Sequence, residues 1–122
     1  KLDIIFIDTL HEAKHVKKII YNYYNLLNVG GYIFIDDISH LPYINNEKSS
    51  FYCEINNKET FYELLNIYYN NQNCFELNFS FKSSGLAIIK KSTDCELKES
   101  FKIKSRENSL KNLIRKLWKN FK

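Results

Sequence analysis

The chain opens on a short apolar run that ends at an acidic residue. In "LDIIFI" (residues 2–7) five of six residues are apolar, and Asp8 follows at once. A continuous run of this length is typical of a strand buried on both faces of a sheet. A second such run, "YIFIDDI" (32–38), also closes on acid. We therefore expect two buried strands, each followed by carboxylates.

The residues between these runs recur with helical spacing. Their apolar stripe comprises Val16, Ile20, Tyr23, Tyr24 and Leu27. The period predicts a helix, and "NVGG" (28–31) predicts its end, because Gly30 or Gly31 can adopt the left-handed backbone of a helix C-terminus. With no helix after it, the glycine pair does not predict a phosphate-binding loop. A strand, a helix and a strand joined by short turns predict a β-α-β unit with parallel strands.

The middle of the chain predicts a loop, a helix and two further strands. Residues 39–56 lack a clear period and hold the single proline, which predicts a long loop over the strand ends. Asn56 and Glu59 form a capping-box pattern, and the stripe after it is Phe61, Leu64, Leu65 and Tyr68. Residues 74–82 alternate apolar with polar, as in a strand near a sheet edge, and 86–91 can return as a hairpin. The fold class is therefore α/β: two parallel strands plus an antiparallel β-hairpin, with flanking helices.

The C-terminal part predicts a polar linker at 92–108 and a basic amphipathic helix at 109–122, separate from a domain at 1–91. The apolar stripe of this helix is Leu110, Leu113, Ile114, Leu117, Trp118 and Phe121, and outside it lie Lys111, Arg115, Lys116 and Lys119. Such a helix can dock on its own domain or on a partner chain, or it can lie on an anionic membrane surface. Docking is the expected arrangement, because apolar stripes are more often buried in protein.

Charge is concentrated in the same tail. Residues 1–104 carry 12 Lys and 13 acidic residues, a net −1, whereas residues 105–122 carry six Lys or Arg and one Glu, a net +5. The body of the chain therefore lacks the basic footprint of a nucleic-acid-binding protein, and we expect no nucleic-acid partner.

Composition is that of a globular, cytoplasmic protein. The chain is 44% hydrophobic and 26% charged, and no apolar run approaches the roughly 20 residues of a membrane span. No signal peptide is recognisable.

Cys53, Cys74 and Cys95 are odd in number and show no C-x-x-C spacing, so we expect three reduced thiols. The chain starts with Lys1 and contains no Met, which favours a fragment of a longer protein.

Acidic residues follow both predicted parallel strands, at the edge where open α/β sheets bind ligands. Because neighbouring strands lie about 4.8 Å apart, Asp8 can converge with Asp36 or Asp37. Oxygen ligands suit Mg²⁺ or another hard divalent cation. The alternative is that these residues are helix N-caps and loop acids. In a regular strand, Asp36 and Asp37 would point to opposite faces.

Three other polar residues belong to the same predicted edge. His11 lies three residues after Asp8 and could act as general base on a substrate hydroxyl; the alternative is an ordinary polar residue in the first turn of a helix. In the loop, His40 and Tyr43 are candidate substrate contacts. His15, further along the predicted helix, is expected to be solvated.

The stretch "LDIIFIDTLHEAKHVKKII…NLLNVGGYIFIDDI" resembles the C-terminal half of class I S-adenosylmethionine-dependent methyltransferases. The likeness is to the group with "D-h-h-h-I-D-G-x-H-x-x-x-x-V" and "L-x-x-G-G-Y-h-h-h-D-D", where h is apolar, and it extends to about residue 91. It implies the C-terminal half of a Rossmann-like methyltransferase sheet and methyl transfer to a small hydroxylated acceptor, such as a sugar. In metal-dependent relatives of the catechol and macrocin O-methyltransferase types, acids at Asp8, Asp36 and Asp37 hold the cation. By position, His11 takes the place of a catalytic Lys.

The sequence departs from this family in two respects. Thr9-Leu10 replaces the usual Gly-x, at the turn where Asp8 and Thr9 would meet the methionine part of the cofactor. The N-terminal half, with its glycine-rich turn, is also absent, so the chain alone is expected to be inactive. Two alternatives stay open: a non-catalytic binding or assembly module that needs a partner strand, and another α/β enzyme such as a hydroxylase or sugar-modifying enzyme.

Overall fold

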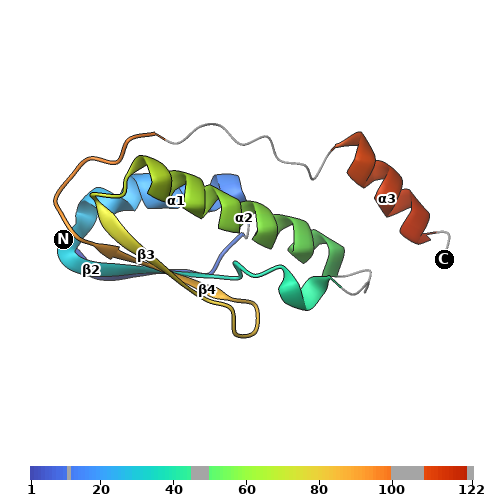
Figure 1. Ribbon diagram of the computed structural model, residues 1–122, viewed down its shortest axis with the longest axis horizontal. Coiled ribbons are helices and arrows are strands. Elements are labelled where there is room, and N and C mark those ends of the chain that lie inside the picture. The colour runs from blue at the N-terminus through green and yellow to red at the C-terminus, as the bar shows by residue number, and fades with distance from the viewer. Residues whose placement is uncertain (11, 45–49, 100–108, 121–122) are drawn as a thin grey trace.

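The computed structural model describes residues 1–10, 12–44, 50–99 and 109–120. Figure 1 shows the strands lying beside helices α1 and α2, with helix α3 at the C-terminus. The elements in chain order are β1 (Leu2–Ile7), α1 (Ala13–Tyr23), a 3-10 turn η1 (Tyr24–Leu26), β2 (Leu27–Asp36), a 3-10 turn η2 (Leu41–Tyr43), α2 (Ser50–Asn70), β3 (Phe75–Ser80), β4 (Leu86–Lys91) and α3 (Leu110–Asn120).

The four strands form one sheet in the order β1-β2-β4-β3. Strands β1 and β2 are parallel, whereas β4 runs antiparallel to both β2 and β3. The predicted sheet of two parallel strands and an antiparallel hairpin is therefore confirmed. The hairpin inserts with its second strand, β4, next to β2, which leaves β3 at the edge. In β3 Phe75 is buried and Glu76 exposed, as the alternation predicted.

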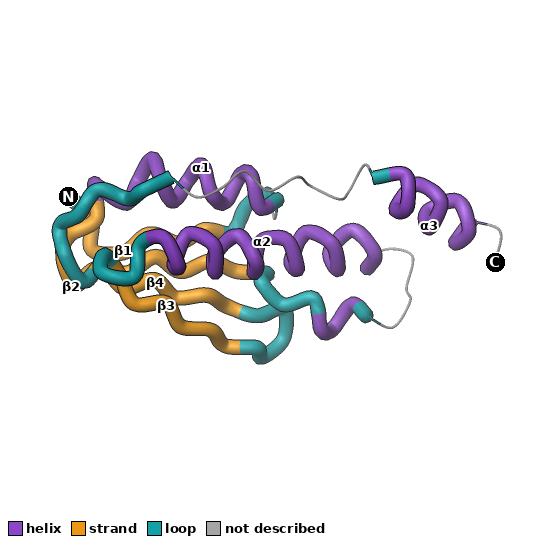
Figure 2. The backbone as a smooth tube through the Cα atoms, turned by 45° about the horizontal axis from the view of Figure 1, so that its top comes forward, coloured by secondary structure: helices purple, strands orange, loops and turns teal. Residues whose placement is uncertain are grey.

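Helices α1 and α2 both cover the same face of the sheet (Figures 1 and 2). The residues of β2 and β4 that point at the helices alternate with solvated ones, because successive side chains on a strand face opposite ways. The core so formed contains Ile7, Val16, Ile20, Tyr24, Leu27, Ile33, Ile35, Ile38, Leu64, Ile67, Phe75, Ala87 and Ile89.

The opposite face of the sheet is apolar and solvent-exposed over β1 and β2. The exposed fractions are 42% for Leu2, 62% for Ile4, 60% for Phe6 and 36% for Tyr32. We call these four side chains the open face. In this chain β1 is therefore an edge strand, and no helix of the described residues covers this side (Figure 1). The prediction that β1 is buried on both faces concerns a longer protein and stays a prediction.

Helix α1 ends earlier than its apolar period indicates. The stripe residues Val16, Ile20 and Tyr24 are buried as predicted, but the residues from Leu27 onward belong to β2. Leu27 pairs with Leu2, and the register shifts before Ile4. Gly30 has the expected positive φ of 84°, but it lies in this irregular part of the strand. The spacing of apolar residues could not show where the helix ends, because Leu27 is fully buried in the strand, as it would be in a helix.

Helix α2 begins at Ser50, six residues before the predicted start. The predicted loop over residues 39–56 is correspondingly shorter, and Asn56 and Asn57 are buried within the helix. The capping-box pattern was misleading because polar side chains at these positions serve tertiary contacts: Asn57 Nδ2 donates to the carbonyl of Ser39 at 2.9 Å.

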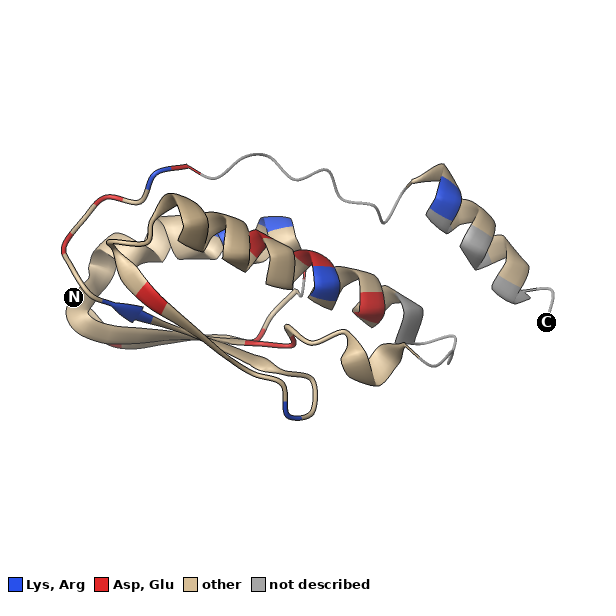
Figure 3. Ribbon diagram, viewed as in Figure 1, with Lys and Arg blue, Asp and Glu red and all other residues tan. Residues whose placement is uncertain are grey.

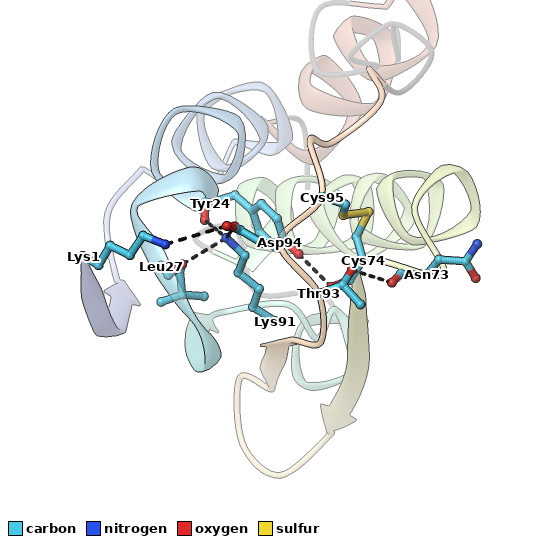
Figure 4. A network of polar contacts seen from close by, with 9 residues as sticks. All are labelled: Lys1, Tyr24, Leu27, Asn73, Cys74, Lys91, Thr93, Asp94 and Cys95. Atoms are coloured by element: carbon cyan, nitrogen blue, oxygen red, sulfur yellow. Dashed lines mark hydrogen bonds and ion pairs between the residues drawn. A yellow bond between two sulfur atoms is a disulfide. The ribbon is translucent and has the colours of Figure 1, made fainter.

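Cys74 and Cys95 form a disulfide, with their Cα atoms 5.7 Å apart (Figure 4). The expectation of three reduced thiols is wrong for this pair, and Cys53 is free. The sequence spacing did not predict this pairing, because the two cysteines come together only when β3 and the segment after β4 have folded. The disulfide fastens the first part of the segment expected as a linker. Further along, Lys98 N donates to Asn71 Oδ1 at 2.7 Å, and Tyr21 Oη donates to the Lys98 carbonyl at 2.7 Å.

We expect Cys95→Ser to lower the free energy of unfolding by about 3 kcal/mol, because the bond closes a loop of moderate length in the unfolded chain. Urea unfolding with and without dithiothreitol measures the effect, and reduction of the unmodified chain should reproduce the variant. Cys53→Ser is the matched control and should leave the midpoint unchanged. An unmodified chain whose midpoint does not respond to dithiothreitol would contradict the pairing.

A fully buried lysine, Lys91, lies at the end of the sheet opposite the acidic strand ends (Figure 4). Lys91 Nζ donates to Asp94 Oδ1 at 2.7 Å and to the carbonyls of Leu27 at 3.0 Å and Tyr24 at 3.4 Å. It also lies 4.8 Å from the centre of the Tyr24 ring. Lys1 adds an ion pair to Asp94 at 3.7 Å. Hydrogen bonds from Lys91 and the charges of both lysines lower the pKa of Asp94.

Tyr24 gives the fold a defined response to alkaline pH. Burial, and secondarily the charge of Asp94, raises the pKa of Tyr24 to about 12. The unfolded chain loses this proton near pH 10, so the free energy of unfolding should fall as pH rises from about 10 to about 12. Tyr24→Phe should remove this part of the decline. At neutral pH it should cost about 1 kcal/mol, because Tyr24 Oη donates to the Cys74 carbonyl at 2.8 Å.

Urea unfolding at a series of pH values checks this expectation, with Tyr23→Phe as the control. Tyr23 is adjacent in sequence but 45% exposed, so its removal should leave the alkaline slope unchanged. Equal slopes for the Tyr24→Phe variant and the unmodified chain would refute the assignment.

Candidate functional site

The carboxyl ends of β1 and β2 bring two predicted site residues side by side. Ile7 pairs with Ile35 in the parallel register, so Asp8 and Asp36 follow at the same edge. Figure 3 shows acidic residues at these strand ends. Asp8 and Thr9 are exposed. The alternative that Asp8 caps the following helix is excluded, because the N-cap residue of α1 is Glu12.

Asp36 and Asp37 have different roles at the end of β2. Asp36 Oδ1 accepts a hydrogen bond from the main-chain N–H of Asp37 at 2.8 Å. Asp37 has a φ of 58°, in the left-handed region that few residues other than glycine adopt. The chain therefore turns sharply at this point, and both carboxylates are half-buried. A strained backbone held by its neighbours is a feature that clusters at functional sites.

Tyr43 joins this pair from the turn η2. Burial raises the pKa of Tyr43, and the charges of Asp37, Cys53 and Asp36 add to the rise. The phenol therefore interacts with the charges of both carboxylates, and its O–H can donate a hydrogen bond. Sequence reasoning assigned Tyr43 to the substrate but missed Cys53, because the early start of α2 is what brings the thiol to this site. His40, also assigned to the substrate, is half-buried, and its carbonyl accepts the Tyr43 N–H at 3.0 Å.

The loop between β2 and η2 is anchored on two sides. Ser39 N donates to the Ser84 carbonyl at 2.7 Å, and the Ser39 carbonyl accepts from Asn57 Nδ2. Ser39 is fully buried. A Cβ added to Gly85 would lie 2.6 Å from the Cβ of Ser39. The hairpin turn and α2 thus fix the loop that carries Asp37 and Tyr43. The sequence "SSG" could be recognised as a turn, but the contact of this turn with Ser39 could not be predicted.

The other side of the site is formed by the start of α1 and the first turns of α2. Tyr52 Oη donates to Glu12 Oε1 at 3.5 Å. His11, the predicted general base, lies outside the described residues. Asn56 precedes Asn57, the residue of α2 that binds the Ser39 carbonyl. Asn56 is 1% exposed, and its Nδ2 has no hydrogen-bond partner among the described residues. A buried amide without a partner is a rare and costly feature.

The predicted cation site is not seen as a ready-made cluster. Across the described parts of the chain, no three His, Cys, Asp or Glu side chains lie close enough together to hold a metal ion. Asp36 Oδ1 accepts the Asp37 N–H, and the left-handed turn at Asp37 ends the strand. The assignment of a divalent cation to Asp8, Asp36 and Asp37 stays a prediction.

The comparisons with known proteins support the fold. No protein-family model and no curated protein sequence matches this chain. Among solved structures, it is similar to the SAH-bound methyltransferase PaMTH1 of Podospora anserina, with a TM-score of 0.57 and 18% sequence identity. The match covers 75% of this chain and 42% of that protein, so the chain spans less than half of its length. The chain thus has a methyltransferase-like α/β fold, as the resemblance of its two motifs predicted. Within the described residues, no helix is long and apolar enough to cross a membrane.

Proposed function

We propose that this chain is the acceptor-side part of an S-adenosylmethionine-dependent O-methyltransferase that acts on a small hydroxylated compound. The observation that carries the proposal is the joint placement of Asp36, Asp37 and Tyr43 at the carboxyl ends of a methyltransferase-like sheet. Ligands of open α/β sheets bind at this edge.

Each residue has a role that follows from its chemistry. The bound cofactor would supply an electrophilic methyl group. The acceptor hydroxyl has to lose a proton, and His11 is our candidate base for removing it. A divalent cation at Asp8, Asp36 and Asp37, which the family resemblance implies, stays a prediction. Tyr43 would donate a hydrogen bond to the acceptor. Asp8 and Thr9, exposed after β1, would contact the cofactor.

The open face supports the further proposal that this chain is completed by an N-terminal half. Apolar side chains on the uncovered side of an edge strand promote aggregation unless another element covers them. Additional strands beside β1, with helices over Leu2, Ile4 and Phe6, would bury them. Sequencing the coding DNA upstream of Lys1 tests this directly. An open frame encoding a strand, a glycine-rich turn and a helix supports it; a stop codon there favours an assembly module with a partner chain.

In the protein encoded by the whole reading frame, we expect His11→Ala to lower kcat for methyl transfer by roughly 10²- to 10⁴-fold, the usual contribution of a general base. The acid limb of the pH profile, near the pKa of about 6.5 of an ordinary histidine, should disappear with it. His15→Ala is the control and should retain both activity and profile. A His11→Ala variant within threefold of the unmodified enzyme would remove the base assignment.

A further inference from the structure

Helix α3 presents an apolar stripe to solvent. Its exposed fractions are 77% for Leu110, 50% for Leu113, 50% for Ile114, 54% for Leu117 and 71% for Trp118. Figures 1 and 2 both show α3 apart from the sheet and from α1 and α2. Docking of this helix on its own domain is not seen among the described residues, and the other expected arrangement, docking on a partner chain, stays a prediction. Five large apolar side chains at helical spacing are therefore exposed on α3.

The charge of this segment indicates what that surface is. Residues 109–122 contain five Lys or Arg and no acidic residue, whereas residues 1–104 have a net charge of −1. Lys111 is exposed on α3. An amphipathic helix with basic residues and an aromatic in its apolar stripe combines the two interactions that hold a helix at a lipid interface, apolar burial and attraction to anionic headgroups. Tryptophan in particular favours the boundary between headgroups and acyl chains.

We propose that α3 binds the surface of membranes that contain anionic phospholipids. The helix would lie in the plane of the interface, with Leu113, Leu117 and Trp118 in the acyl boundary. Its 11 residues span roughly 16 Å, at about 1.5 Å per residue, which is too short to cross a bilayer core of about 30 Å. The proposal is independent of the methyltransferase assignment.

Trp118 is the single tryptophan of the chain, so its fluorescence reports on α3 alone. We expect vesicles of phosphatidylcholine and phosphatidylserine to shift its emission to shorter wavelength and to carry the chain upward in a flotation gradient. Vesicles of phosphatidylcholine alone should do neither. Binding should weaken from low to high salt, because the Debye length falls to about 3 Å at 1 M. Flotation separates binding from aggregation, since aggregates sink.

Matched variants locate the contact. Leu113→Ser with Leu117→Ser should abolish the shift and the flotation, whereas Leu26→Ser with Leu41→Ser, at residues 48% and 55% exposed elsewhere on the chain, should change neither. Lys111→Gln should weaken vesicle binding roughly fivefold, since each basic residue near an anionic surface contributes about that factor. Lys58→Gln removes the same charge from α2 and should have no effect.

Three results would overturn the proposal: no flotation of the unmodified chain, equal binding to vesicles without phosphatidylserine, or equal loss of binding in the Leu26/Leu41 control. The first would instead favour a protein partner for α3. The second would mean that apolar contact acts without charge recognition. The third would move the contact away from α3.

Discussion

Lys91→Met should lower the free energy of unfolding by about 3 kcal/mol. The substitution preserves most of the side-chain volume but removes the donor that serves the carbonyls of Tyr24 and Leu27. Each buried carbonyl that loses its donor costs about 1–3 kcal/mol. For a chain of this size the melting temperature should fall by on the order of 10 °C. Thermal unfolding followed by circular dichroism measures it.

Lys90→Met is the matched control for this substitution. Lys90 is the neighbouring residue on β4, half-exposed, and pairs with Glu76 at 3.5 Å on the opposite face of the sheet. Surface ion pairs of this kind contribute little, so its loss should change the free energy by less than about 0.5 kcal/mol. If Lys91→Met were as stable as the unmodified chain, the cost of burying the ammonium would offset its hydrogen bonds, and the network would not stabilise the fold.

Gly85→Ala should destabilise the fold by about 3 kcal/mol and disturb the candidate site. Gly85 has a φ of 83°, and an added Cβ would stand 2.6 Å from Cβ and 2.8 Å from N of Ser39. The left-handed backbone costs an alanine about 1–2 kcal/mol, and relieving the contact costs about as much again. Because Ser39 belongs to the loop between Asp37 and Tyr43, its displacement should also move those residues.

Gly30→Ala separates the cost of the left-handed backbone from the cost of the contact with Ser39. Gly30 has nearly the same φ, 84°, but apart from its two chain neighbours no described residue has an atom within 4 Å of the added Cβ. It should therefore show the backbone cost alone, about 1–2 kcal/mol. Urea unfolding of the two variants measures the difference, and the amide NMR signals of residues 36–43 should shift only in Gly85→Ala. Equal destabilisation would show that the Ser39 contact yields without cost.

The fold could be predicted from the sequence where one physical rule decides the outcome. Continuous apolar runs located β1 and β2, strict alternation located β3, and the acids after the runs indicated the ligand-binding edge. Boundaries failed where a residue is buried in either structure, as for Leu27, or where polar side chains are used in tertiary contacts, as for Asn57. Contacts between distant segments, such as the Cys74–Cys95 disulfide, leave no local signal.

The sequence could indicate the edge of the sheet at which the candidate site lies, because acids follow both parallel strands. The register pairs Ile7 with Ile35, so Asp8 and Asp36 follow at the same edge. The sequence could not indicate the left-handed turn at Asp37, and no group of three metal ligands is found among the described residues. The cation therefore stays a prediction. The contribution of Cys53 to the electrostatics of Tyr43 required the position of α2, which no spacing in residues 39–56 indicated.

The most direct test of the proposed function is the binding of S-adenosylhomocysteine, by isothermal titration calorimetry, to the protein encoded by the whole reading frame. We expect saturable one-to-one binding that Asp8→Ala weakens and Asp3→Ala, an exposed control at the other end of β1, leaves unchanged. No detectable heat of binding to a folded protein would contradict the methyltransferase assignment.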